Sequence, residues 1–369
     1  MKEKTSKWLH VVLFSLVVFL TLPAGPYIRD FIYKNLGKWS VIYIVAAILA
    51  AGLIFTLYRM FRNWDKFSFT RFLWFIVIVY LYWLALRRTF KIPIESVHFV
   101  EYGILSFLVY RALRTSYNER CVFLAAFFFT YCIGVMDEFI QWLLPSRVGA
   151  FRDILLNAVS AGLVQLLLWK CVQPNNLKKG FPARSFRFAA FAAVTCILLT
   201  ASYISLVSDF GYRIKDPEVG KFFSRIPGEE LLKSDALGWE HYSAALDSSS
   251  TVPYMEFLER TEDPFLYEMR VRVFRRDRHF EDESYHVSCS EEEILRKYFG
   301  RSLENSSFSW PEERAETCRA LEKDYSKYRS PVSQELIVRY GEQEMWAVTA
   351  VLVAVFLLLG TRKNLTREH

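Results

Sequence analysis

Apolar runs of about membrane length recur along the chain. Since about 20 mostly apolar residues cross a bilayer as a helix, the pattern predicts an all-α polytopic membrane protein with about eight transmembrane helices. The predicted spans are Trp8–Leu22, Trp39–Tyr58, Phe72–Leu86, Val97–Tyr110, Cys121–Ile140, Ile154–Cys171, Phe188–Val207 and Met345–Leu359. The fourth reaches membrane length only when 94–113 is counted. The first follows Lys2, Lys4 and Lys7 and so also fits a secretory signal, but the poor cleavage sequence after Leu22 favours a retained span.

Polar side chains interrupt three consecutive predicted spans, the fourth, fifth and sixth. Within each span they recur at three- or four-residue spacing, so each helix presents one polar stripe and is otherwise apolar. The stripes contain His98, Glu101 and Tyr102, then Glu138 and Gln141, then Asp153 and Asn157. Ionisable groups in membrane helices are costly, so such stripes face one another or a wet cavity rather than lipid.

Composition separates a membrane part from a second domain. The chain is 53% hydrophobic and 17% aromatic, which is typical of a membrane protein, whereas its charged residues concentrate after about residue 209. We therefore predict a membrane domain over 1–208, a small, net acidic α+β domain over 209–344, and a final helix with its tail over 345–369.

Lysine and arginine set the predicted orientation. The amino terminus, the tail and the loops after the second, fourth and sixth spans hold more of them than the short loops on the other side, so both termini should be cytoplasmic and 209–344 extracytoplasmic. All three polar stripes then fall at the outer membrane level. Arg87, Arg88 and Lys91 lie at the same level and would form a positive rim suited to phosphate.

The motifs that carry these stripes resemble one known family. The segments HFVEYGILSFLVYRAL (98–113) and GVMDEFIQWLLPSRVGAFRDILLNAVSAGL (134–163) are similar to the VanZ-like family of bacterial integral membrane proteins, over roughly 72–172. The positions that match the family's pattern are His98, Glu101, Tyr102, Glu138, Gln141, Pro145, Arg147, Asp153 and Asn157. The extra flanking spans and the large acidic segment depart from a minimal member.

The resemblance implies a location, the cell envelope, but no particular reaction. The family is named for a protein that lowers susceptibility to the glycopeptide antibiotic teicoplanin, and most members have no established biochemical activity. It therefore implies a role in the cell envelope and an effect on glycopeptide susceptibility. The expected partners are membrane lipids and a lipid-linked cell-wall precursor or another anionic envelope molecule, with no nucleic acid. A cofactor cannot be read from the sequence.

Three functional classes remain open for the polar residues. They could bind an envelope molecule, with Arg147 and the helix start near Asp153 taking an anion while Glu101 and Glu138 hold the arginine. They could form an intramembrane enzyme in which Glu138 or His98 is the general base. A metal site on His98, Glu101, Glu138 and Asp153 is a sub-case without a specific motif, so no metal ligand is assigned. They could also be structural, joining helices by hydrogen bonds.

The acidic segment carries its own structural signals. Alternation over Leu266–Phe274 predicts a strand, Ser290 and Gly300 are expected to bound a helix, and Pro311 should start another. We expect loops at 247–253 and 304–311. His241, His279 and His286 are scattered and read as solvated side chains.

The cysteines fall into two groups, one in the predicted membrane domain and one in the predicted extracytoplasmic domain. Cys121, Cys132, Cys171 and Cys196 fall in or at the ends of predicted spans and should be reduced packing residues. Only Cys289 and Cys318 fall in the segment expected outside, where disulfides persist, so we predict that they are joined.

Reporter fusions test the predicted orientation. Fusions after Thr115 and Lys179 should report cytoplasm, because positively charged loops stay inside, and fusions near Asp247 and Ser307 should report the outside. A cytoplasmic signal at Ser307 would contradict the outward-facing site.

Overall fold

A computed structural model describes residues 2–62, 68–144, 149–173, 177–178, 183–321, 329–330 and 336–361. The chain divides into two compact units. The first joins Met1–Val207 to Trp346–His369, and the second is Ser208–Met345. Each unit is described by itself below.

The first unit is built from helices. They are α1 (Lys2–Thr21), α2 (Gly25–Leu36), α3 (Ser40–Arg62), α4 (Phe69–Arg88), α5 (His98–Leu113), α6 (Cys121–Leu143), α7 (Phe151–Leu166), α8 (Ala183–Val207) and α15 (Glu342–Thr361). A 3-10 turn, Pro93–Val97, precedes α5, and a π-helical segment, Leu167–Val172, continues α7.

Seven of the described helices are long and apolar enough to cross a membrane, so the protein is a multi-pass membrane protein. They are α1, α3, α4, α6, α7 with its π segment, α8 and α15. The remaining predicted span is α5, a helix of only 16 residues that the 3-10 turn precedes. The short helix α2 was not predicted.

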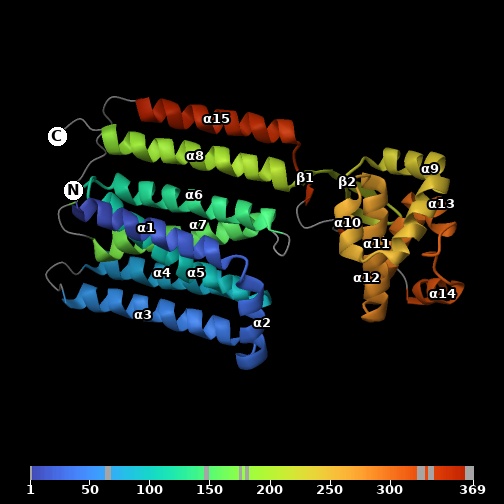
Figure 1. The fold of residues 1–369 in the computed structure, drawn as a ribbon, viewed down its shortest axis with the longest axis horizontal. Coiled ribbons are helices and arrows are strands. Elements are labelled where there is room, and N and C mark those ends of the chain that lie inside the picture. The colour runs from blue at the N-terminus through green and yellow to red at the C-terminus, as the bar shows by residue number, and fades with distance from the viewer. Residues whose placement is uncertain are drawn as a thin grey trace. The chain divides into compact units, whose positions relative to one another are not determined.

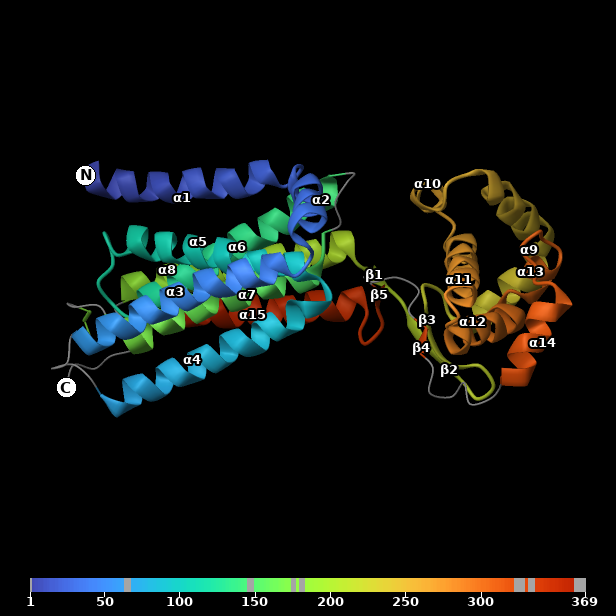
Figure 2. The same ribbon diagram turned by 90° about the horizontal axis from the view of Figure 1, so that it is seen from below.

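The long helices of this unit run side by side (Figures 1 and 2). At its centre α6 packs against α7 and α8, while α5 packs against α7, α6 and α1. In Figure 1, α1 begins and α15 ends at one end of the unit. The starts of α5 and α7 and the ends of α6 and α8 lie at the opposite end. The three polar stripes therefore meet at the end from which the chain leaves for the second unit.

Neutral polar groups join α5 to α7 along their length. The Ser160 hydroxyl donates to the Phe99 carbonyl at 2.9 Å. Nε2 of Gln165 donates to the Ser106 hydroxyl oxygen at 2.7 Å. Interhelical hydrogen bonds of this kind contribute about 0.6–2 kcal/mol each in membranes. Their groups are uncharged, so they stabilise the pair without burying a charge.

The second unit consists of helices and short strands. Its helices are α9 (Gly228–Ser248), α10 (Tyr254–Arg260), α11 (Pro264–Glu281), α12 (Tyr285–Tyr298), α13 (Gly300–Glu304) and α14 (Glu312–Leu321). Its strands are β1 (Asp209–Phe210), β2 (Tyr212–Asp216), β3 (Gly220–Ser224), β4 (Arg329–Ser330) and β5 (Leu336–Ile337). Strand β3 pairs antiparallel with β2 and parallel with β4, and β1 pairs parallel with β5. Phe222, Met269 and Ile294 are fully buried in its core.

The predicted strand Leu266–Phe274 is wrong, because this segment lies within α11. Asp263 caps the helix, its side chain accepting from the backbone N–H of Leu266 at 2.9 Å, and Pro264 occupies the first turn. Proline is favoured at the first helical position and an aspartate at the cap, so these two residues start a helix. The alternation in the sequence does not correspond to alternating burial, since Arg272 is as fully buried as the neighbouring Val273.

Other boundaries in this unit also differ from the predictions. Helix α12 begins at Tyr285, before Ser290, whose hydroxyl donates to the His286 carbonyl at 2.7 Å within the helix. At its other end α12 stops at Tyr298, just before the predicted Gly300, which itself begins α13. The expected loop at 247–253 is largely helical, since α9 continues to Ser248 and a 3-10 turn follows. Each of these helices extends beyond its strongest local signal, because packing in the unit stabilises the added turn.

A disulfide joins Cys289 on α12 to Cys318 on α14. The cysteines of the first unit are free, and Sγ of Cys132 lies 3.2 Å from Sγ of Cys196.

A buried ion cluster lies at the centre of the second unit. The guanidinium of Arg272 is fully buried, 2.8 Å from Oε1 of Glu268 and 3.1 Å from Oε2 of Glu291. Oε2 of Glu268 also accepts from the Ser224 hydroxyl at 2.8 Å and from the backbone N–H of Arg225 at 3.1 Å. Every charge in this cluster depends on its partners, because a buried ion that loses its counter-ion is strongly destabilising.

Glu268→Gln should therefore destabilise the second unit by about 3–5 kcal/mol, because it leaves Arg272 under-compensated and turns an amide N–H toward other donors. Pulse proteolysis of the full-length protein in urea measures the change. The matched control is Glu256→Gln on α10, whose side chain is 42% exposed and pairs with Arg260 at the surface. It should cost less than about 1 kcal/mol. Equal effects of the two substitutions would contradict the buried cluster's role.

Candidate functional site

Three of the predicted polar side chains converge at one end of the first unit. A ring nitrogen of His98 and one carboxylate oxygen each of Glu138 and Asp153 lie within 4.8 Å of one another. They come from α5, α6 and α7. Glu138 is fully buried and the other two are half-buried. Ionisable groups that share a small space between membrane helices are typical of functional sites.

A glycine on α6 allows the three helices to approach this closely. A Cβ atom placed on Gly134 would lie 3.1 Å from Cβ of Asn157 on α7 and 3.2 Å from Cε1 of Tyr102 on α5. Small residues permit close helix contacts in membranes. Gly134 is one turn before Glu138, so this contact also sets the helix spacing at the three convergent residues.

Glu138 links the end of α6 to the start of α7. Its Oε1 accepts a hydrogen bond of 2.8 Å from Nε2 of Gln141, and its Oε2 accepts one of 3.0 Å from the backbone N–H of Ala150. The chain must pass close to α6 here, because a Cβ atom on Gly149 would lie 2.6 Å from the Glu138 carbonyl oxygen. These contacts hold the carboxylate in one orientation.

A second polar layer lies one helical turn further along each helix. It contains Tyr102 and Asn157, both of which are buried. The Tyr102 hydroxyl lies beside the Asp137 carboxylate. Neither amide atom of Asn157 has a hydrogen-bond partner among the described residues. Because buried amides are nearly always hydrogen-bonded, Asn157 is suited to contact a bound molecule or ion-bound water.

An ion pair that was not predicted borders the convergent residues. Nη2 of Arg152 lies 2.7 Å from Oε2 of Glu95 and donates to the Arg88 carbonyl at 3.2 Å. The Glu95 carboxylate also interacts electrostatically with Asp153 and His98. Glu95 therefore belongs to the same electrostatic group. Its spacing of three residues before His98 was the signal in the sequence.

The remaining predicted residues lie around this centre. Oε2 of Glu101 is 4.0 Å from Nδ1 of His98, so it borders the histidine rather than joining the group of three. Arg87 and Arg88 are exposed at the end of α4, and the Arg87 guanidinium lies 5.6 Å from the Trp83 ring.

Three predicted positions cannot be placed fully. Pro145 and Arg147 lie outside the described residues, and so does the side chain of Lys91. The predicted phosphate rim is therefore described only through Arg87 and Arg88.

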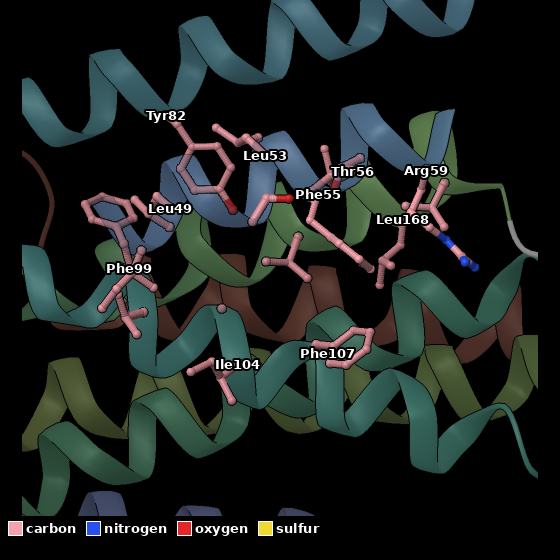
Figure 3. A pocket seen from close by; sticks show the side chains of 17 residues that line it. Leu49, Leu53, Phe55, Thr56, Arg59, Tyr82, Phe99, Ile104, Phe107 and Leu168 are labelled. Atoms are coloured by element: carbon pink, nitrogen blue, oxygen red, sulfur yellow. Dashed lines mark hydrogen bonds between the residues drawn. The ribbon is translucent and has the colours of Figure 1, made fainter. Parts of the chain in front are cut away.

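An apolar groove of about 680 Å³ lies beside the polar residues on the other face of α5 (Figure 3). It is lined by α3, α5, Tyr82 of α4 and the end of α7 with its π segment. Phe99 and Leu49 lie at one end, and Arg59 at the other. Phe99 follows His98 directly in the chain, so the groove begins at the level of the convergent residues.

Comparisons with family models, curated proteins and solved structures returned no match for this chain. The VanZ-like assignment stays a prediction from the sequence motifs.

Gly134→Val should weaken the helix contact around the site. Overpacking of this kind typically costs about 1–3 kcal/mol, because the neighbouring Cβ of Asn157 belongs to a packed helix and cannot turn away. A lower thermal midpoint of the detergent-solubilised protein measures the loss. Gly52→Val on α3 is the control, since a Cβ atom there meets nothing within 4 Å. An unchanged midpoint for Gly134→Val would contradict the close approach.

Proposed function

We propose that this protein binds an anionic, lipid-linked molecule of the cell envelope, with the headgroup at the convergent polar residues and the hydrocarbon chain in the groove. One observation carries the proposal: the convergent polar residues and the apolar groove occupy different faces of α5, and the groove begins at the level of the polar residues. An amphipathic ligand is the class of molecule that needs both surfaces together.

The groove favours a hydrocarbon chain over a polar solute. Its volume of about 680 Å³ falls in the range of about 300–1,000 Å³ found for small-molecule sites. Among the described lining residues, only Thr56, Arg59 and Tyr82 carry polar groups on their side chains. A polar molecule bound there would leave its hydrogen-bonding groups unpaired, whereas an alkyl chain has no such groups.

Basic groups at the polar end favour an anionic headgroup. Arg152 borders the site, Arg87 and Arg88 are exposed at the end of α4, and α7 directs its first N–H groups toward the same region. Arg147 follows α6 in the sequence and is suited to bidentate contact with phosphate. The carboxylate of Glu138 then orients basic partners instead of binding the anion.

The site faces outward in this proposal, and the second unit is extracytoplasmic. Both follow from the charge of the loops. The resemblance to VanZ-like proteins adds the expectation that binding of an envelope component changes susceptibility to glycopeptides.

A purely structural role is the competing explanation. It is disfavoured because neutral groups such as Ser160 and Gln165 already join α5 to α7. A structural contact does not need a histidine and two carboxylates, whose burial costs more. An intramembrane enzyme remains the second alternative, with Glu138 or His98 as the base. His98 and Glu138 lie close together, and two neighbouring ionisable groups favour acid–base catalysis more than a single one would.

Glu138→Gln separates a binding site from a structural contact. It keeps the shape and most hydrogen bonding but removes the charge, so it should abolish any effect on glycopeptide susceptibility while leaving the amount of membrane protein normal. Arg147→Lys should do the same, because lysine cannot make a bidentate contact. Gln165→Leu is the control: it removes a neutral hydrogen bond between α5 and α7 that does not involve Glu138, so it should mainly lower stability by about 1 kcal/mol.

Lipid retention gives an independent measurement on the same variants. Native mass spectrometry of wild-type protein should show a co-purifying anionic lipid, and Ile104→Trp should displace it by filling the groove. The proposal fails if Glu138→Gln and Arg147→Lys both behave as wild type in susceptibility and in lipid retention.

A further inference from the structure

We infer that His98, Glu138 and Asp153 form a binding site for a divalent transition-metal ion such as Zn²⁺. This inference does not rest on the proposed function, since an anionic lipid can bind with or without a metal. It starts from the donor atoms of the three residues, which lie within 4.8 Å of one another.

The spacing of the donors is close to that of a bound ion. Metal–ligand distances of about 2.0–2.2 Å place donors on one ion roughly 3–3.5 Å apart. Small rotations of the side chains therefore close the set around an ion. The three ligands come from α5, α6 and α7, the helices that approach one another closely at Gly134.

The donor types favour a transition metal over Mg²⁺ or Ca²⁺. Imidazole nitrogen suits Zn²⁺ and similar ions, whereas Mg²⁺ and Ca²⁺ prefer oxygen alone. One histidine with two carboxylates also supplies two negative charges that a dication neutralises. Three protein ligands leave a further coordination position open, as in metal sites that bind a water or a substrate.

Surrounding groups provide the outer contacts that metal ligands require. Glu101 lies 4.0 Å from Nδ1 of His98, on a side where a carboxylate can orient a ligating imidazole. Gln141 and the backbone of Ala150 hold the Glu138 carboxylate through hydrogen bonds of 2.8 and 3.0 Å. Ligand carboxylates in metal sites are held in this way.

Asn157 is an independent indication that the space is built for a ligand. It is 1% exposed, and neither its amide nitrogen nor its amide oxygen has a partner among the residues described. It lies one turn from Asp153 on the same face of α7 and contacts the space beside Gly134. One oxygen of Asp153, Oδ1, is likewise buried without a partner in the described chain. An ion with its bound water would satisfy both residues.

Zinc binding by the full-length protein in detergent tests this inference. The Cys132→Ala/Cys196→Ala background is used throughout, because thiols 3.2 Å apart could themselves take zinc. After chelator treatment, isothermal titration with Zn²⁺ and metal analysis after gel filtration should show stoichiometric binding. His98→Gln and Asp153→Asn should each abolish it, and Glu101→Gln should weaken it about 10-fold.

His10→Gln is the matched control for loss of a histidine. His10 is exposed on α1, where Nδ1 lies 2.6 Å from the Ser6 carbonyl oxygen, so this variant should bind zinc as the parent does. Thermal midpoints show that each variant is folded. The inference is overturned if the folded parent binds no zinc, or if His98→Gln and Asp153→Asn bind it as tightly as His10→Gln.

Arg147 is the alternative partner for the carboxylates. If Arg147→Gln binds zinc and the parent does not, the arginine is their counter-ion and the inference is overturned. Lipid retention measured on the same samples keeps the two proposals distinct. Absence of zinc with lipid retained removes only the metal site, whereas bound zinc without lipid removes only the proposed function.

Discussion

The burial of the Glu138 carboxylate is the constraint on which the first unit depends. A fully buried carboxylate between membrane helices requires nearby donors or cations, since its desolvation costs several kcal/mol. Two donors come from opposite sides of the α6–α7 connection, Gln141 and the backbone of Ala150. The same interaction therefore compensates the charge, fixes the entry of the chain into α7 and brings Asp153 to the group of three.

Helix α5 connects this polar centre to the apolar groove. His98 and Tyr102 lie on the face toward α6 and α7, while Phe99 and Phe107 line the groove on another face. A helix of only 16 residues contributes to both the polar centre and the groove, because its two faces have different neighbours. Neutral contacts from Ser106 and Gln165 stabilise its pairing with α7, which leaves the ionisable groups to the end of the bundle.

The second unit compensates buried charge differently. There the carboxylate of Glu268 and the guanidinium of Arg272 are fully buried against each other, and a second carboxylate, Glu291, pairs with the same arginine. The ring of Phe222 lies 4.8 Å from that guanidinium, so an aromatic face covers the charge as well. In the first unit, the side chain of Gln141 and the backbone N–H of Ala150 donate to the convergent carboxylate of Glu138.

The sequence by itself determined the membrane helices, the boundary region near residue 208 and the residues at the polar end. Long apolar runs and helical spacing are local properties, and membrane helices satisfy their own backbone, so the chain pattern is sufficient. Spacing within each helix also identified His98, Glu138 and Asp153 as members of polar stripes. Glu95 was missed because it lies in the 3-10 turn before α5, outside the helical stripe, and pairs with Arg152 of another helix.

Only the tertiary structure decided which polar stripes meet and whether Leu266–Phe274 is a strand or part of a helix. The distance between His98, Glu138 and Asp153 depends on the close helix approach at Gly134, a contact between residues far apart in the chain. Leu266–Phe274 alternates as a strand would, yet it is helical, and carboxylates on α11 itself and on α12 compensate its buried Arg272. A local pattern cannot show that an arginine is buried, since the compensating charge of Glu291 comes from another helix.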